Sequence, residues 1–138
     1  MDEVLLAKAA SIERCLARIR DEYAGTAASL ANITKQDAIV LNVQRACEAA
    51  IDGAMRLVRI HALGVPQDSR QAFDLLVTAG KLDLERALQM KKMVGFRNLA
   101  VHDYARLDLA ILQAIIERHL DDLAAFASFL VTSAGPAR

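Results

Sequence analysis

Tryptophan is absent from this sequence, and aromatic residues of all kinds make up only 4% of its 138 residues. Hydrophobic residues nevertheless reach 54%, so the core must be built from leucine, alanine, isoleucine, valine and methionine. This composition is typical of helical bundles, because several of these residues are strong helix formers. Only two prolines and six glycines interrupt the chain. Its length fits one domain, residues 1–138.

A surplus of charge of either sign is also missing, since 17 basic residues balance 17 acidic ones. Overall charge therefore does not attract nucleic acid, and any such site must be local. The only cysteines, Cys15 and Cys47, have neither metal-ligand spacing nor a disulfide framework, which indicates buried thiols in a reducing cytosol. We expect no metal site and no bound cofactor.

Long apolar runs and export signals are lacking too. The longest uncharged run, residues 123–137, contains serine, threonine, glycine and proline and is too short for a membrane span. The first ten residues lack the basic and apolar segments of a signal peptide. We therefore expect a cytoplasmic protein without a leader and without a membrane partner.

The spacing of apolar residues predicts helices throughout, with a period near 3.6 and no strand-like alternation. Five helices are expected, over about residues 3–24, 35–63, 70–80, 84–101 and 108–132. Gly25 and Gly64 end the first two, Pro66 prevents continuation, and Asp68 or Ser69 caps the third. The predicted fold class is all-α, a bundle of four main helices plus a short one.

The helix expected over residues 84–101 is apolar on two faces. One face carries Met90, Met93, Val94 and Val101 beside Arg97, and the opposite face carries Leu84, Leu88, Gly95 and Leu99. A helix of this kind has more than one partner. One face packs into the bundle, and the other meets a second copy through a two-fold axis. Gly95 would let another backbone approach closely, or it is simply a tolerated helix glycine.

The stretch GFRNLAVHDY, residues 95–104, holds the densest group of reactive side chains. Arg97 is a permanent bidentate cation suited to phosphate, and His102 exchanges a proton near neutral pH. Together they suit metal-independent RNA cleavage, in which His102 takes the ribose 2′-OH proton and Arg97 stabilises the phosphoryl charge. Asn98 and Asp103 are supporting polar residues. On periodicity alone, an arginine and a histidine at a helix end are more often a surface cation and a C-terminal cap than a catalytic pair.

The spacing of the pair raises a difficulty, because five residues on an unbroken helix rotate His102 about 140° from Arg97. The two side chains cannot then converge on one small ligand. Either the helix ends near Val101 so that His102 turns back, or the site is composed across an interface from two copies, and we expect both in part. A two-fold dimer would also supply two histidines, one as base and one as acid.

Positive charge is concentrated around this stretch. Residues 89–106 hold four cations, Lys91, Lys92, Arg97 and Arg106, against the single acid Asp103. Such a patch favours an anionic ligand, and Lys91, Lys92 and Arg106 are candidate RNA-binding residues.

The segment RNLAVHDY contains an Arg-x-x-x-x-His-x-Tyr motif with a polar residue directly after the arginine, and it resembles the HEPN-domain ribonuclease toxins of the HepT type. The flanking segments LGVPQDSRQAFDLL and LQMKKMVGFRN extend the likeness to about residues 4–132. The resemblance implies a HEPN-type two-fold dimer with a ribonuclease site in the cleft between protomers. It also implies that Arg97 and His102 are the catalytic pair and that Asn98 orients the arginine or the RNA backbone.

The same resemblance implies a switch at Tyr104. This residue matches the tyrosine that family members present to an antitoxin, a minimal nucleotidyltransferase called MntA, which transfers AMP from ATP to it. AMP attached two positions from His102 would add charge and bulk where an RNA phosphate would sit. The predicted function is a metal-independent endoribonuclease toxin of a type VII-like toxin–antitoxin system, acting on tRNA or mRNA.

Two other functions stay open. One is a non-catalytic nucleotide- or RNA-binding module that partners a nucleotidyltransferase, and the other is a purely structural helical interaction module. Tyr23 lacks neighbours like those of Tyr104 and is expected to be a packing residue. His61 and His119 fit ordinary positions at a helix end and on a charged helix face.

Overall fold

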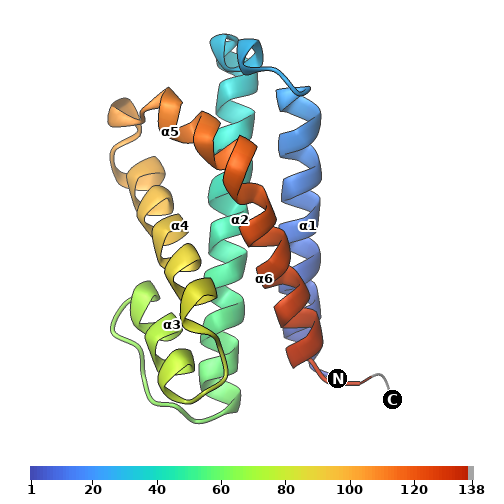
Figure 1. Cartoon of the computed structure of the whole chain (residues 1–138), viewed down its shortest axis with the longest axis vertical. Helices are drawn as coiled ribbons and strands as arrows, with labels where there is room; N and C mark the ends of the chain where they lie inside the picture. Colours follow the sequence, from blue (N-terminus) through green and yellow to red (C-terminus); the bar gives the residue numbers. More distant parts are fainter. Residues whose placement is uncertain (137–138) are drawn as a thin grey trace.

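The computed structural model describes residues 1–136, and every regular element in this range is a helix (Figure 1). The elements are α1 (Glu3–Tyr23), η1 (Ala27–Ala31), α2 (Ile33–Ile60), α3 (Ser69–Thr78), α4 (Leu84–His102), η2 (Tyr104–Arg106), α5 (Leu109–Ala114), η3 (Ile115–His119) and α6 (Leu120–Ser133). The all-α class is confirmed. The single domain predicted over residues 1–138 ends two residues beyond this range and stays a prediction. No described helix combines the length and apolarity needed to cross a membrane.

Capping residues explain where the helices begin and end. α2 begins slightly earlier than expected because the Asn32 side chain accepts a hydrogen bond from the Lys35 N–H at 3.1 Å. It ends at Ile60 rather than near residue 63, because Ala62 takes the left-handed conformation with φ of 54° and closes the helix before Gly64 is reached. Asp68 is the cap of α3, one of the two predicted candidates.

The helix predicted over residues 108–132 is present as the continuous path of α5, η3 and α6. Its middle portion, η3, is a π-helical turn, which the apolar spacing did not predict. A π-turn inserts an extra residue and rotates the following face. The adjacent residues Ile115 and Ile116 at its start are both buried.

The core lies where α1, α4 and α6 surround α2 (Figure 1). The predicted inner residues of α1 are all fully buried: Leu5, Ile12, Leu16 and Ile19. The predicted seam of α2 is buried as well: Val40, Val43, Cys47, Ala50, Ala54 and Leu57. Two of the few aromatic rings, Phe73 of α3 and Phe126 of α6, meet edge to face with centroids 5.7 Å apart. Aliphatic side chains thus supply most of the core, as the composition predicted.

Gly53 allows α2 and α6 to pack closely. A Cβ atom at this position would lie 2.6 Å from Cδ1 and 2.8 Å from Cδ2 of Leu130, well inside van der Waals contact. Leu130 is fully buried and has little room to move. The glycine is therefore required by packing between two distant helices, which its place in the sequence does not reveal.

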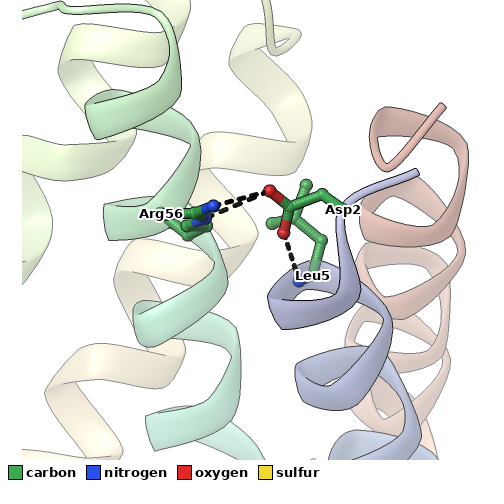
Figure 2. A network of polar contacts seen from close by, with 3 residues as sticks. All are labelled: Asp2, Leu5 and Arg56. Atoms are coloured by element: carbon green, nitrogen blue, oxygen red, sulfur yellow. Dashed lines mark hydrogen bonds and ion pairs between the residues drawn. The ribbon is translucent and has the colours of Figure 1, made fainter.

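Asp2 joins the start of the chain to two other helices (Figure 2). Its Oδ1 accepts a hydrogen bond from the Leu5 N–H at 2.9 Å and caps α1, while Oδ2 accepts from Arg56 Nη2 of α2 at 2.9 Å. The Asp2 N–H also donates to the Ala134 carbonyl at 2.8 Å. The hydrogen bond from Arg56 holds the pKa of the Asp2 carboxyl below its usual range. These contacts keep the start of α1 beside the end of α6 (Figure 1).

Candidate active site

The motif residues lie on the C-terminal half of α4 and in the turn that follows. Arg97 is half-buried, whereas His102 is the exposed last residue of α4. The helix is unbroken between them, and the N–H of Asp103 still bonds to the Leu99 carbonyl at 2.9 Å. α4 ends at His102, close to Val101 as expected, but His102 does not turn back, because helical hydrogen bonding continues one residue past it. Arg97 and His102 leave the helix about 140° apart.

Three elements hold the guanidinium group of Arg97. Its Nε donates to Asn98 Oδ1 at 2.9 Å, and its Nη2 donates to Ser69 Oγ at 3.1 Å, at the start of α3. Its Nη1 lies 3.9 Å from Glu48 Oε1 of α2. The Arg97 side chain is only 21% exposed. These contacts restrict its rotamer but leave N–H groups on Nη1 and Nη2 for a ligand, because a guanidinium carries five donors.

Ser69 and Glu48 are contacts that sequence reasoning missed. The sequence predicts Ser69 only as a helix cap, and it predicts only an apolar seam for the helix that carries Glu48. Neither shows a signal in the sequence, because only the packing of α2 and α3 against α4 brings them to Arg97. The hydrogen bond from Arg97 to Asn98 is local and follows from their adjacency.

The positive patch expected around the motif is weaker in three dimensions. Lys91 Nζ pairs with Asp74 Oδ1 of α3 at 2.8 Å, and Arg106 Nε lies 3.4 Å from Asp103 Oδ2. Glu48 lies beside Arg97 as well. Asp74 and Glu48 belong to neighbouring helices outside residues 89–106, and their negative charges offset part of the positive charge of that segment. Lys92 remains exposed on α4. Roles for Lys91, Lys92 and Arg106 in RNA binding stay predictions.

Tyr104 begins η2, directly after the helix that carries His102, and is 40% exposed. Its hydroxyl donates a hydrogen bond of 2.6 Å to Asp37 Oδ1 of α2. Partial burial, together with this hydrogen bond to a carboxylate, raises the pKa of Tyr104 to about 12. The hydroxyl is therefore protonated at neutral pH, and its proton points at Asp37.

Tyr23 has a carboxylate neighbour that sequence reasoning did not expect. Its hydroxyl donates to Glu117 Oε2 at 2.5 Å, which links the end of α1 to the π-helical turn η3. Burial, followed by the contact with Glu117, raises the pKa of Tyr23 to about 12. Tyr23 is only 5% exposed, so it does pack in the core as predicted.

The remaining reactive side chains among residues 1–136 give no second site. Cys47 is buried as expected, but Cys15 is only partly buried. His119 Nδ1 lies 3.0 Å from Asp122 Oδ2, one turn along the same helix. Among residues 1–136, no three His, Cys, Asp or Glu side chains are grouped so that they could hold a metal ion.

An apolar groove of about 720 Å³ runs between α4 and the α5–η3–α6 helix. Leu88, Gly95 and Leu99, from the second apolar face predicted for α4, line it. The side chain closest to Gly95 belongs to α3, because a Cβ atom on Gly95 would lie 2.9 Å from Arg70 Nη2. Within the chain, the close neighbour of this glycine is thus a side chain, and the approach of a second copy's backbone stays a prediction.

The helical bundle and its arginine–histidine–tyrosine stretch define a class of ribonuclease. The family model described as ribonuclease HepT-like matches residues 12–130. This chain belongs to the HepT-like ribonuclease family, and its enzyme class is endoribonuclease.

Named relatives agree with this assignment. The chain is 40% identical over 126 residues to the mRNA nuclease HepT of Shewanella oneidensis, covering 91% of this chain and 95% of the relative. A solved structure of the tri-AMPylated Shewanella oneidensis HEPN toxin in complex with MNT antitoxin is 39% identical with a TM-score of 0.89, covering 96% of this chain and 99% of the other. A solved toxin–antitoxin structure with AMP-PNP is 38% identical, again with a TM-score of 0.89, covering 94% and 99%.

Proposed function

We propose that this chain is the cytoplasmic toxin of a type VII-like toxin–antitoxin system, a metal-independent endoribonuclease that acts as a two-fold homodimer on tRNA or mRNA. The observation that carries the proposal is Arg97, held by Ser69 and Asn98 on the helix that also bears His102. Its relatives support the assignment, since one is named an mRNA nuclease and another is a HEPN toxin solved with its antitoxin.

The chemistry follows from the two side chains. A neutral His102 takes the proton of a ribose 2′-OH, and the freed oxygen attacks the adjacent phosphorus. The Arg97 guanidinium stabilises the charge that develops on the phosphoryl oxygens. Because Asn98 and Ser69 already orient this group, little reorganisation is needed when the transition state forms. Asp103, which caps the end of α4 beside His102, has the supporting role.

The dimer supplies what one protomer lacks. Arg97 and His102 leave α4 on different sides, and a single copy offers one histidine for a reaction that uses both a base and an acid. Leu84 and Leu88 of α4 are 62% and 48% exposed, which leaves part of its second apolar face available to another copy. Two copies of the motif facing each other would bring two arginines and two histidines to one cleft.

Heterodimers test this composite site. Wild-type and His102→Ala chains carrying different affinity tags are co-expressed, and the mixed dimer is purified through both tags. We expect it to retain less than about a tenth of wild-type RNA cleavage, because either the base or the acid is missing. Half of the wild-type rate would instead show that each protomer carries a complete site of its own.

We further propose that the antitoxin is an MntA-like nucleotidyltransferase that silences the enzyme by transferring AMP to Tyr104. The Tyr104 residue is 40% exposed and lies two residues from His102, so a phosphodiester on its hydroxyl would place negative charge and bulk in the path of an RNA phosphate. Intact-mass spectrometry after co-expression with the partner should show additions of AMP to the wild type and none to Tyr104→Phe. If the wild-type protein gains no AMP, the proposed silencing through Tyr104 is wrong.

A further inference from the structure

The phenol group of Tyr104 is already engaged before any modification. Its hydroxyl donates to Asp37 Oδ1 at 2.6 Å, across 67 residues of sequence. Asp37 lies near the start of α2, at the same end of the molecule as η2 (Figure 1). The oxygen that makes this hydrogen bond is the one to which AMP would be attached, so the contact bears directly on that reaction.

The surroundings of the pair favour a reactive role over a packing role. Asp37 is exposed and is in none of the ion pairs among residues 1–136, so no cation in that range neutralises its carboxylate. The related pair of Tyr23 and Glu117 offers a contrast, because Tyr23 is only 5% exposed whereas Tyr104 is 40% exposed. Tyr104 is therefore open to another protein, whereas Tyr23 is buried.

We infer that Asp37 is the residue of this chain that orients the Tyr104 hydroxyl for AMP transfer and accepts its proton. The inference rests on the proposed neutralisation by a nucleotidyltransferase that uses ATP. In the step, the Tyr104 oxygen forms a bond to the α-phosphorus of ATP, the bond from that phosphorus to pyrophosphate breaks, and the phenol proton passes to the Asp37 carboxylate and then to water. Kinases use an aspartate in the same way to accept the proton of a substrate hydroxyl.

A phenol needs such a base at neutral pH. Burial and the contact with Asp37 raise the pKa of Tyr104 to about 12, so almost none of it is phenolate. Because the hydroxyl is the donor in this hydrogen bond, the lone pairs of the phenol oxygen stay available for attack while the proton is aligned with its acceptor. The toxin would in this way contribute a group to its own silencing.

The experiment measures AMP transfer from ATP to the full-length toxin by its nucleotidyltransferase antitoxin, followed by intact mass. For Asp37→Ala we expect kcat to fall about 100-fold, the usual contribution of a general base, with the KM for ATP unchanged. Asp37→Glu keeps a carboxylate and should recover most of the rate. Replacing Tyr104 by 3,5-difluorotyrosine, a more acidic phenol, should remove most of the dependence on Asp37, because the proton then leaves without help.

Matched controls separate this role from folding. Tyr23→Phe removes the buried counterpart of the pair and should leave AMP transfer unchanged. The Asp37→Ala variant should cleave RNA at the wild-type rate, since Asp37 contacts neither Arg97 nor His102. Its thermal unfolding temperature should also match that of the wild type.

Each outcome has one meaning. Transfer to Asp37→Ala at the wild-type rate would overturn the inference and leave the proposed function intact. A slow Asp37→Ala that neither the glutamate nor the difluorotyrosine variant restores would also overturn it, because the carboxylate would then only support the local structure. If the wild-type toxin accepts no AMP, both the inference about Asp37 and the proposed neutralisation are wrong. The proposed ribonuclease activity is tested separately, by RNA cleavage.

Discussion

Replacement of His102 by alanine is expected to lower RNA cleavage by about 10²- to 10⁴-fold, the range that a general acid or base contributes. If both copies of His102 act in one cleft, the homodimeric variant loses base and acid together, and the loss falls at the upper end. The measurement is cleavage of RNA by purified protein in the presence of EDTA. Because His102 is an exposed residue at the end of α4, the variant should fold and dimerise normally.

His61→Ala is the matched control for this result. His61 is likewise exposed at the end of a helix, α2, and its loss should leave cleavage unchanged. Retained cleavage by His102→Ala would refute the assignment of the catalytic pair. A wild-type protein that binds RNA but never cleaves it would favour the non-catalytic binding module.

Replacement of Arg97 by alanine is expected to lower cleavage by about 10²- to 10³-fold, as when one preorganised donor to an oxyanion is lost. Arg97→Lys should be nearly as defective, because a lysine has the charge but not the planar set of donors that meets Asn98 and Ser69. The loss should appear in kcat more than in KM, since the guanidinium acts on charge that develops in the transition state. Steady-state cleavage of a labelled RNA measures both constants.

Arg106→Ala is the control for general charge. Arg106 lies close to the motif, and its side chain is 82% exposed, so its loss removes one cation without disturbing the packing. A raised KM with unchanged kcat is expected, because a phosphate contact made equally in substrate and transition state affects binding alone. An equal fall in kcat for Arg97→Ala and Arg106→Ala would contradict a special role for Arg97.

Local features of the sequence predicted most of the fold. Helix positions, the cap at Asp68 and the inner face of α1 depend on residues within one or two turns, and the structure confirms them. The ends of α2 were misplaced because Asn32 and Ala62 act through backbone geometry that composition does not specify. The π-turn η3 was missed because it is one short turn within a long helix, and apolar periodicity predicts the helix as a whole rather than the hydrogen bonding of a single turn.

Contacts between distant segments could not be predicted in this way. Gly53 against Leu130, Ser69 against Arg97 and Asp37 against Tyr104 each join residues whose separation in sequence carries no signal. The same holds for Asp74, whose pairing with Lys91 weakens the positive patch. Each contact depends on how helices cross, and crossing geometry is set by the packing of whole surfaces.

By itself, the sequence determined an all-helical bundle, the two apolar faces of α4 and the motif that joins Arg97, His102 and Tyr104, because helical periodicity and motif spacing are properties of neighbouring residues. Only the tertiary structure decided that α4 continues through His102 and that the Arg97 guanidinium is oriented from α3. It also decided that the hydroxyl of Tyr104 points at a carboxylate of α2. The physical reason is that hydrogen bonds and ion pairs act over a few ångströms, and only the folded chain brings residues 37, 69 and 104 that close to their partners.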